Sequence, residues 1–208
     1  MNKITHLFYF VFLICIAACS FTDEEQFVNP SIVVNNNHTA KPARTDWAFI
    51  AGQLVQSYTN NYSTTSNSTL AEKIVRLDSA SMQVVLYNDL KPLNFSAPTT
   101  SEAQVFLTNY ETAYNNLDVS VTMKSYLTAF LQENPNYDIL LTTIERDILL
   151  TLTEKKQLRF IAMWLVDTTT PPEVDIWKKR KILAAVKGFE QSTANALFNV
   201  ALVEIAKN

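Results

Sequence analysis

The side chains best suited to nucleophilic or metal chemistry are scarce in this sequence, which holds two cysteines and two histidines. Cys15 lies inside an apolar run, Cys19 directly follows that run, and both His6 and His38 precede residue 45. A folded domain that begins near residue 45 therefore contains neither residue type. We expect it to lack Ser-His-Asp and Cys-His catalysis, zinc sites built on imidazole and Glu-x-x-His di-iron sites.

Cys19 closes a segment with the layout of a signal peptide. Lys3 supplies a positive charge, residues 7–18 are uninterrupted apolar, and Ile16-Ala17-Ala18 leads into Cys19. About 12 apolar residues are too few to span a bilayer but suit a signal h-region. The motif resembles the lipobox of bacterial lipoproteins, which implies that the Cys19 thiol is acylated and becomes the first mature residue. The alternative is an ordinary secretory signal in which Cys19 has no role.

The residues after Cys19 bear on the location of the protein. Ser20 does not resemble the aspartate that retains lipoproteins in the inner membrane of enterobacteria. Thr22-Asp23-Glu24-Glu25 resembles the acidic export tag of surface lipoproteins in Bacteroidota, although such a charge run also suits a plain solvated tether. The resemblance implies a protein held by lipid in the bacterial envelope, at the outer membrane, on its periplasmic or its outer face.

Composition excludes further functions. The two glycines, Gly52 and Gly188, are too few for a phosphate-cradling loop, and they argue against a sheet protein because hairpins and bulges rely on glycine. The net charge of −3 leaves no broad basic footprint for nucleic acid. We expect no cofactor, no metal and no nucleic-acid partner.

The chain divides into a signal peptide (1–18), a lipidated flexible tether (19–44) and a helical domain (45–208). The tether is polar and rich in Asn and Pro, so it cannot bury enough apolar surface to offset the entropy of ordering. In the domain, apolar residues recur at helical spacing and predict an all-α fold, an irregular bundle of about six to seven helices packed around a long C-terminal helix. We expect these helices to start at Thr45 or Asp46, Thr69, Thr99, Asp118 or Ser120, Asp138, Thr151 or Thr153, and Pro172 or Glu173. Thr69 with Glu72 and Thr99 with Glu102 have the spacing of capping boxes, and the helix from Thr69 is expected to end before Pro92.

The last helix is predicted to run to Lys207 without a break. Its apolar residues alternate at spacings of four and three, and further apolar residues widen the stripe, which is typical of a helix at the centre of a bundle. A seam between two copies of the chain is the alternative. The stripe consists of Ile182, Val186, Phe189, Thr193, Ala196, Val200 and Val203, widened by Leu183, Ala185, Leu197 and Leu202.

The densest charge run is Trp177-Lys178-Lys179-Arg180-Lys181. Four consecutive cations on a helix wrap the whole cylinder, so a solvated helix end is the plain interpretation. The functional interpretation is a contact for anionic headgroups, lipopolysaccharide phosphates or an acidic partner, with Trp177 at the interface.

Two further patterns could carry chemistry. Glu145 and Asp147 are two positions apart, so on a helix they point to different sides and cannot flank one glycosidic bond, although a partner on another helix is left open. Asp167-Thr168-Thr169 and Asp78-Ser79-Ala80 resemble the acceptor pattern for protein O-glycosylation in Bacteroidota. That resemblance implies modification of Thr168.

These observations favour an envelope-anchored lipoprotein whose helical domain binds or scaffolds another protein and is not an enzyme. One alternative is an immunity or inhibitor lipoprotein that intercepts an envelope-targeted toxin. Another is a glycan hydrolase that depends on carboxylates alone.

Overall fold

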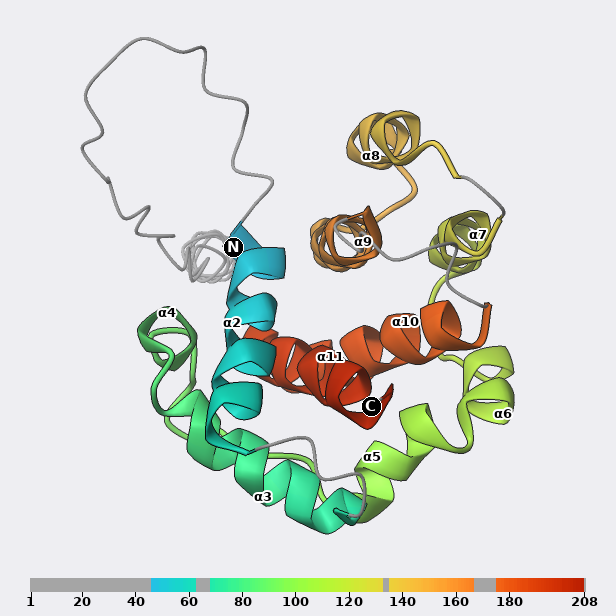
Figure 1. The fold of residues 1–208 in the computed structure, drawn as a ribbon. Coiled ribbons are helices and arrows are strands. Elements are labelled where there is room, and N and C mark those ends of the chain that lie inside the picture. The colour runs from blue at the N-terminus through green and yellow to red at the C-terminus, as the bar shows by residue number, and fades with distance from the viewer. Residues whose placement is uncertain (1–45, 63–67, 133–134, 167–174, 208) are drawn as a thin grey trace, which may run out of the picture. The chain divides into compact units, whose positions relative to one another are not determined.

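The computed structural model describes residues 46–62, 68–132, 135–166 and 175–207 (Figure 1). The predicted signal peptide and tether, with Cys19, lie outside the described residues, and so does Thr168. Every regular element among the described residues is an α-helix, which confirms the all-α class. These helices are α2 (Asp46–Asn61), α3 (Leu70–Ser81), α4 (Val85–Asn88), α5 (Thr100–Leu107), α6 (Tyr110–Asn115), α7 (Val121–Phe130), α8 (Tyr137–Arg146), α9 (Leu152–Val166), α10 (Asp175–Phe189) and α11 (Thr193–Lys207).

The two predicted capping boxes are present. Thr69 precedes α3 and Thr99 precedes α5, and each accepts a hydrogen bond from the backbone N–H three residues on. Glu72 and Glu102 in turn accept hydrogen bonds from the backbone N–H groups of the two threonines, at 2.8 and 2.7 Å. Each box satisfies two helix-terminal donors that would otherwise lack partners.

A third box starts α9. The Thr151 N–H donates to Glu154 Oε2 at 2.9 Å, and the Glu154 N–H donates to Thr151 Oγ1 at 3.2 Å. Of the two starts expected here, Thr151 is therefore the cap. Ser120 rather than Asp118 caps α7, and Asn136 rather than Asp138 caps α8.

Several helices are shorter than predicted. The helix expected from Thr69 to the residues before Pro92 ends at Ser81, whose hydroxyl donates to the Asp78 carbonyl at 2.7 Å. The helix expected from Thr99 onward stops at Leu107, and α6 begins separately at Tyr110. Local hydrogen bonds from serine and threonine side chains compete with the helical ladder at such breaks.

The prediction of one unbroken C-terminal helix is wrong, because the segment forms two helices with a turn at residues 190–192. The segment is a hairpin of α10 and α11, with Ser192 as the cap of α11: its hydroxyl accepts from the Asn195 N–H at 3.1 Å. Lys181 pairs with Glu204, and the Asn199 side chain donates to the Ala184 carbonyl, so the two helices run antiparallel.

Gly188 allows this hairpin to close tightly. A Cβ atom added at Gly188 would lie 2.3 Å from the Cα of Ala196. Only a glycine permits such an approach of the two backbones at this point.

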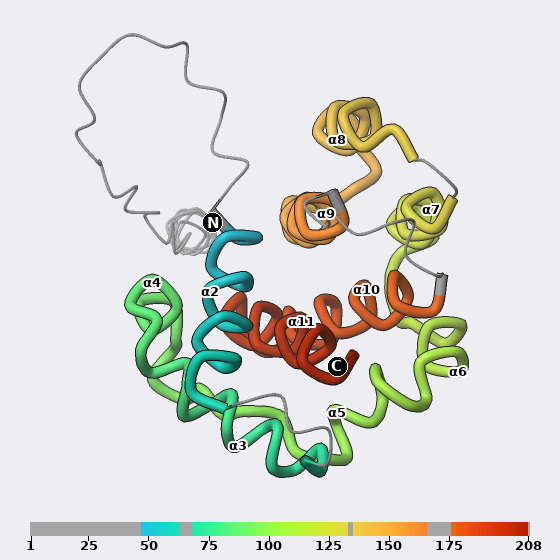
Figure 2. The backbone as a smooth tube through the Cα atoms, in the orientation of Figure 1, coloured from blue at the N-terminus to red at the C-terminus, as the bar shows by residue number. Residues whose placement is uncertain are grey.

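The α10–α11 hairpin forms the centre of the described helices, which confirms that the C-terminal segment is the core. Residues 194–203 of α11 are all buried. Helices α2, α3 and α5 pack on α11, and α5, α6 and α9 pack on α10 (Figure 2). The apolar stripe that could have formed a seam between two copies is thus used within one chain.

An aromatic cluster ties the start of α2 to this centre. The Trp47 ring lies 5.3 Å from Phe160 of α9, and Phe160 lies 5.1 Å from Phe189 at the end of α10. Helix α9 in turn contacts α7 and α8, so α8 is connected to the hairpin through α9.

Candidate functional site

The basic run at the start of α10 is shared among several neighbours. Lys181 is 1% exposed, and its Nζ lies 2.5 Å from Glu204 of α11 and 5.9 Å from the ring centre of Trp164. A buried lysine needs such a partner because removing its charge from water is costly. Lys181 therefore does not lie on the surface that the sequence suggested for anionic contacts.

The other members of the run also contact neighbouring segments. Lys179 Nζ lies 3.3 Å from Glu111 of α6, and Lys178 Nζ donates to the Gln132 carbonyl at 3.4 Å. The contact of Trp177, Lys178 and Lys179 with an anionic surface stays a prediction.

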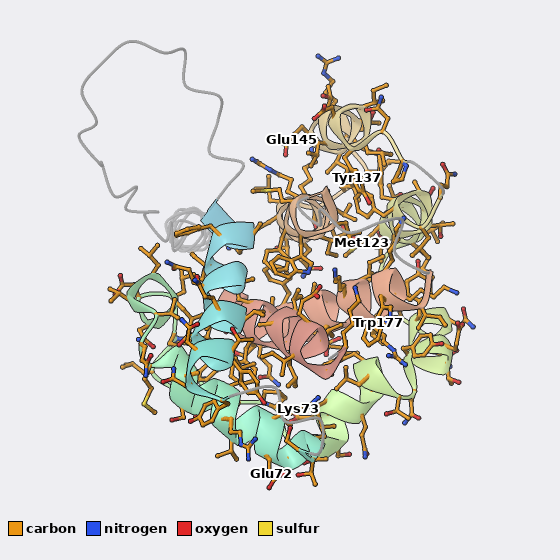
Figure 3. All side chains as sticks on the ribbon, viewed as in Figure 1. Glu72, Lys73, Met123, Tyr137, Glu145 and Trp177 are labelled. Atoms are coloured by element: carbon orange, nitrogen blue, oxygen red, sulfur yellow. The ribbon has the colours of Figure 1, made fainter. Side chains whose placement is uncertain are left out.

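Arg180 is held between two aromatic rings. Its guanidinium lies 4.7 Å from the ring centre of Tyr110 and 4.5 Å from that of Trp177, which lies beside the C-terminal part of α11 in Figure 3. Its Nε atom is buried and has no hydrogen-bond acceptor among the residues that the structure describes. These cation–π contacts fasten α6 to α10 and account for the presence of Trp177 in the run.

The two carboxylates of the α8 end are each engaged separately. Glu145 forms an exposed ion pair with Arg159 of α9 at 3.2 Å. Asp147 accepts from the Tyr126 hydroxyl and from the Leu149 N–H, both at 2.9 Å. Burial, and then the bond to Asp147, raise the pKa of Tyr126. These contacts join α7, α8 and α9, and they do not place the carboxyl groups of Glu145 and Asp147 opposite each other across a site.

A hollow of about 340 Å³ lies between α2 and the turn that leads into α4. The Ser57 hydroxyl donates to the Ala80 carbonyl at 2.9 Å, and Asn61 donates to Gln83 at 3.0 Å, so hydrogen bonds hold the two sides together. Most of the polar side chains facing it are carboxamides, and we call it the amide groove. Its lining is Gln53, Gln56, Ser57 and Asn60 of α2 with Gln83, Val84, Val85 and Leu86.

Five exposed aliphatic side chains lie in the segment that forms one side of the amide groove, and two of them, Val85 and Leu86, line it. They follow one another closely along the chain from the end of α3 to the loop before α5, and we call them the apolar rim. The rim consists of Met82, Val85, Leu86, Leu90 and Leu93.

A second hollow, of about 240 Å³, lies between α5 and the α10–α11 turn. Phe106 and Val105 form part of its wall, and the Lys187–Glu190 ion pair lies beside them. Asn199 also borders it, but its unpartnered Oδ1 atom is itself buried from solvent. The hollow therefore presents no free hydrogen-bonding group from Asn199.

Among the residues that the structure describes, no three His, Cys, Asp or Glu side chains form a group that could hold a metal ion. In this same part of the chain, no helix has the length and apolar character needed to cross a membrane. No protein-family model, curated protein or solved structure matches the chain. Function must therefore be argued from the residues themselves.

The amide groove and its rim were not predicted from the sequence. Gln53, Gln56 and Asn60 share a face of α2, and this carboxamide face was an available signal. Val85 and Leu86, by contrast, became exposed only because the helix ends at Ser81 and the chain turns before α4.

Proposed function

We propose that this protein is a lipid-anchored envelope lipoprotein whose helical domain binds another protein through the amide groove and the apolar rim. The anchor rests on the resemblance of residues 16–19 to a lipobox. The location, at the outer membrane, rests on the residues that follow Cys19. On this proposal the domain is a binding module rather than an enzyme.

The apolar rim is the observation that carries the proposal. Each aliphatic side chain exposed to water forgoes about 25 cal/mol for every Å² that burial would cover. Single exposed aliphatics are ordinary on soluble proteins, whereas a cluster beside a groove is typical of an interaction surface. All five rim residues are exposed although the chain has a core large enough to bury aliphatics.

The groove adds the polar part of a protein contact. Carboxamide side chains both donate and accept hydrogen bonds, so they suit the N–H and C=O groups of a partner's backbone. The charged groups near the rim are few: Asp89 is exposed, and Lys91 is paired with Asp78 at 3.7 Å. A partner with an apolar segment and free backbone groups fits this surface.

The two alternatives differ in what they require. A toxin-binding immunity protein would use the same kind of surface, and the identity of the partner distinguishes it. A glycan hydrolase would require two facing carboxyl groups, whereas Glu145 and Asp147 have separate partners. The described geometry thus favours binding over hydrolysis.

Substitution at the rim tests the proposal. We expect the native protein to recover a specific partner from its own envelope after cross-linking, and Leu86→Asp to lower that recovery roughly 30-fold, as for a central interface residue. Val121→Asp is the matched control, because Val121 is an exposed aliphatic at the start of α7, outside the rim. Quantitative mass spectrometry of the captured proteins measures the effect. Equal recovery by both variants, or no partner specific to the wild-type chain, would contradict the proposal.

A further inference from the structure

The turn between α8 and α9 carries the second cluster of exposed aliphatic side chains, which we call the apolar tip. Ile148 is 93% exposed, Leu149 is 72% exposed and Leu152 is 86% exposed. Helix α8 packs on α7 and α9, and Figure 1 shows α8 on the far side of α9 from α10. The tip lies where α8 and α9 are joined, and neither of the two hollows described above includes it.

The backbone of the tip is tied down by hydrogen bonds within the protein. The Leu149 N–H donates to Asp147 Oδ1 at 2.9 Å, and the Asp147 N–H donates to the Thr143 carbonyl at 3.0 Å. The Thr151 N–H donates to Glu154 at 2.9 Å. Because a bilayer offers few partners for backbone donors, each of these internal hydrogen bonds lowers the cost of placing the turn in it.

Cations without a carboxylate partner flank the tip. Arg146 is exposed and forms no ion pair with any residue that the structure describes. Lys155 Nζ donates to the carbonyl oxygen of Glu145 at 2.8 Å, which leaves its charge uncompensated by that contact. Three carboxylates lie nearby, and each is bonded within the protein. Glu145 pairs with Arg159, Asp147 accepts hydrogen bonds from the Tyr126 hydroxyl and the Leu149 N–H, and Glu154 caps α9. Positive charge beside exposed aliphatics is the pattern that binds the interface of an anionic bilayer.

We propose that the apolar tip inserts into the surface of an anionic lipid bilayer, with Ile148, Leu149 and Leu152 below the headgroups and Arg146 and Lys155 among the lipid phosphates. Exposed aliphatic side chains need no complementary cavity in a fluid bilayer. The apolar rim differs, because two of its residues, Val85 and Leu86, line a groove. This insertion is independent of the acylation of Cys19 and of any protein bound at the groove.

Fluorescence from single sites tests the insertion. The full chain carries Cys15→Ser and Cys19→Ser, so that the environment-sensitive nitrobenzoxadiazole probe attaches only to Leu149→Cys or, in the matched control, to Val85→Cys in the rim. Both chains are added to vesicles of phosphatidylglycerol and phosphatidylethanolamine with brominated acyl chains. The probe at 149 is expected to shift to the blue, to be quenched by the brominated lipid and to resist aqueous iodide, whereas the probe at 85 stays open to iodide. The proposal is overturned if the probe at 149 remains as accessible to iodide as the probe at 85. It is also overturned if the brominated lipid quenches the probes at both positions.

Two further sets of variants separate the apolar and the charged contributions. Ile148→Ser with Leu152→Ser is expected to abolish the shift at 149, and an unchanged thermal unfolding midpoint shows that these exposed positions do not support the fold. Neutralising Arg146 and Lys155 with glutamine is expected to lower the inserted fraction about five-fold for each charge. Lys187→Gln is the charge control, because Lys187 lies in the last turn of α10 and outside the tip. This substitution should leave the inserted fraction unchanged. Equal insertion of all three charge variants overturns the role of anionic headgroups.

Discussion

Lys181 and Glu204 show how single residues decide the form of the core. Lys181 is enclosed among the apolar side chains of α10 and meets Glu204 on α11. A buried ion pair contributes little net stability, because desolvation offsets the attraction. It does restrict the register, since sliding either helix by one turn would separate the two charges. The pair therefore accounts for a lysine in an otherwise apolar interface.

The two glycines have opposite roles, and this gives a matched prediction. Gly188→Ala is expected to lower the free energy of unfolding by about 1–3 kcal/mol, because the new methyl group meets the Ala196 backbone. Gly52→Ala is expected to raise it by about 0.5–1 kcal/mol, since Gly52 lies within α2 and nothing surrounds the added Cβ within 4 Å. Urea unfolding measures both values. Equal effects of the two substitutions would contradict the close packing of α10 on α11.

At the scale of the elements, the helix starts marked by capping boxes were predictable, whereas the starts of α4, α6 and α11 were not. A capping box is a contact between residues three apart, so Thr69 and Thr99 could be recognised directly from the sequence. The break between α10 and α11, by contrast, forms because α11 packs back on α10, which is a contact between residues far apart in the sequence. The apolar spacing from Phe189 to Thr193 continues through this turn, so periodicity alone predicted one helix. Gly188 and the serine at 192 were the local signals of a break.

The cap of α5 gives a prediction with a pH dependence. Hydrogen bonds from the backbone and then the side chain of Thr99 hold the pKa of Glu102 below its ordinary value of 4.5. The stabilisation is therefore complete above that ordinary value and is lost as the pH falls through the lowered one. Thr99→Ala should lower the free energy of unfolding by about 1 kcal/mol at pH 7, and the difference from wild type should shrink under acid.

Thr100→Ala is the control for the α5 cap, because Thr100 is exposed in the first turn and lies outside the box. Denaturant unfolding at pH 7 and at pH 3 provides the comparison. A Thr99→Ala deficit that stays constant between the two pH values would show that the ionised Glu102 does not support the helix start.

At the scale of the whole molecule, the proposed functions rest on different kinds of evidence. The anchor can be argued only from the sequence of residues 1–25, which precede the described residues. The amide groove and the apolar tip depend on how separate helices meet. The surface predicted from the sequence was the Trp177–Lys181 run instead, because charge density along the chain does not reveal that Lys181 is buried. Surface position is a property of packing and could not be predicted from spacing.

The anchor is the central claim, since it places the amide groove at a membrane. The most direct test is the mass of the N-terminal peptide of the native protein, with Cys19→Ser as the comparison. We predict a wild-type chain that begins at Cys19 and carries the added mass of a diacylglycerol. In the variant, neither that cleavage nor that modification should occur, and the helical circular dichroism of the domain should remain. An unmodified Cys19, or a mature chain that begins at another residue, would contradict the account.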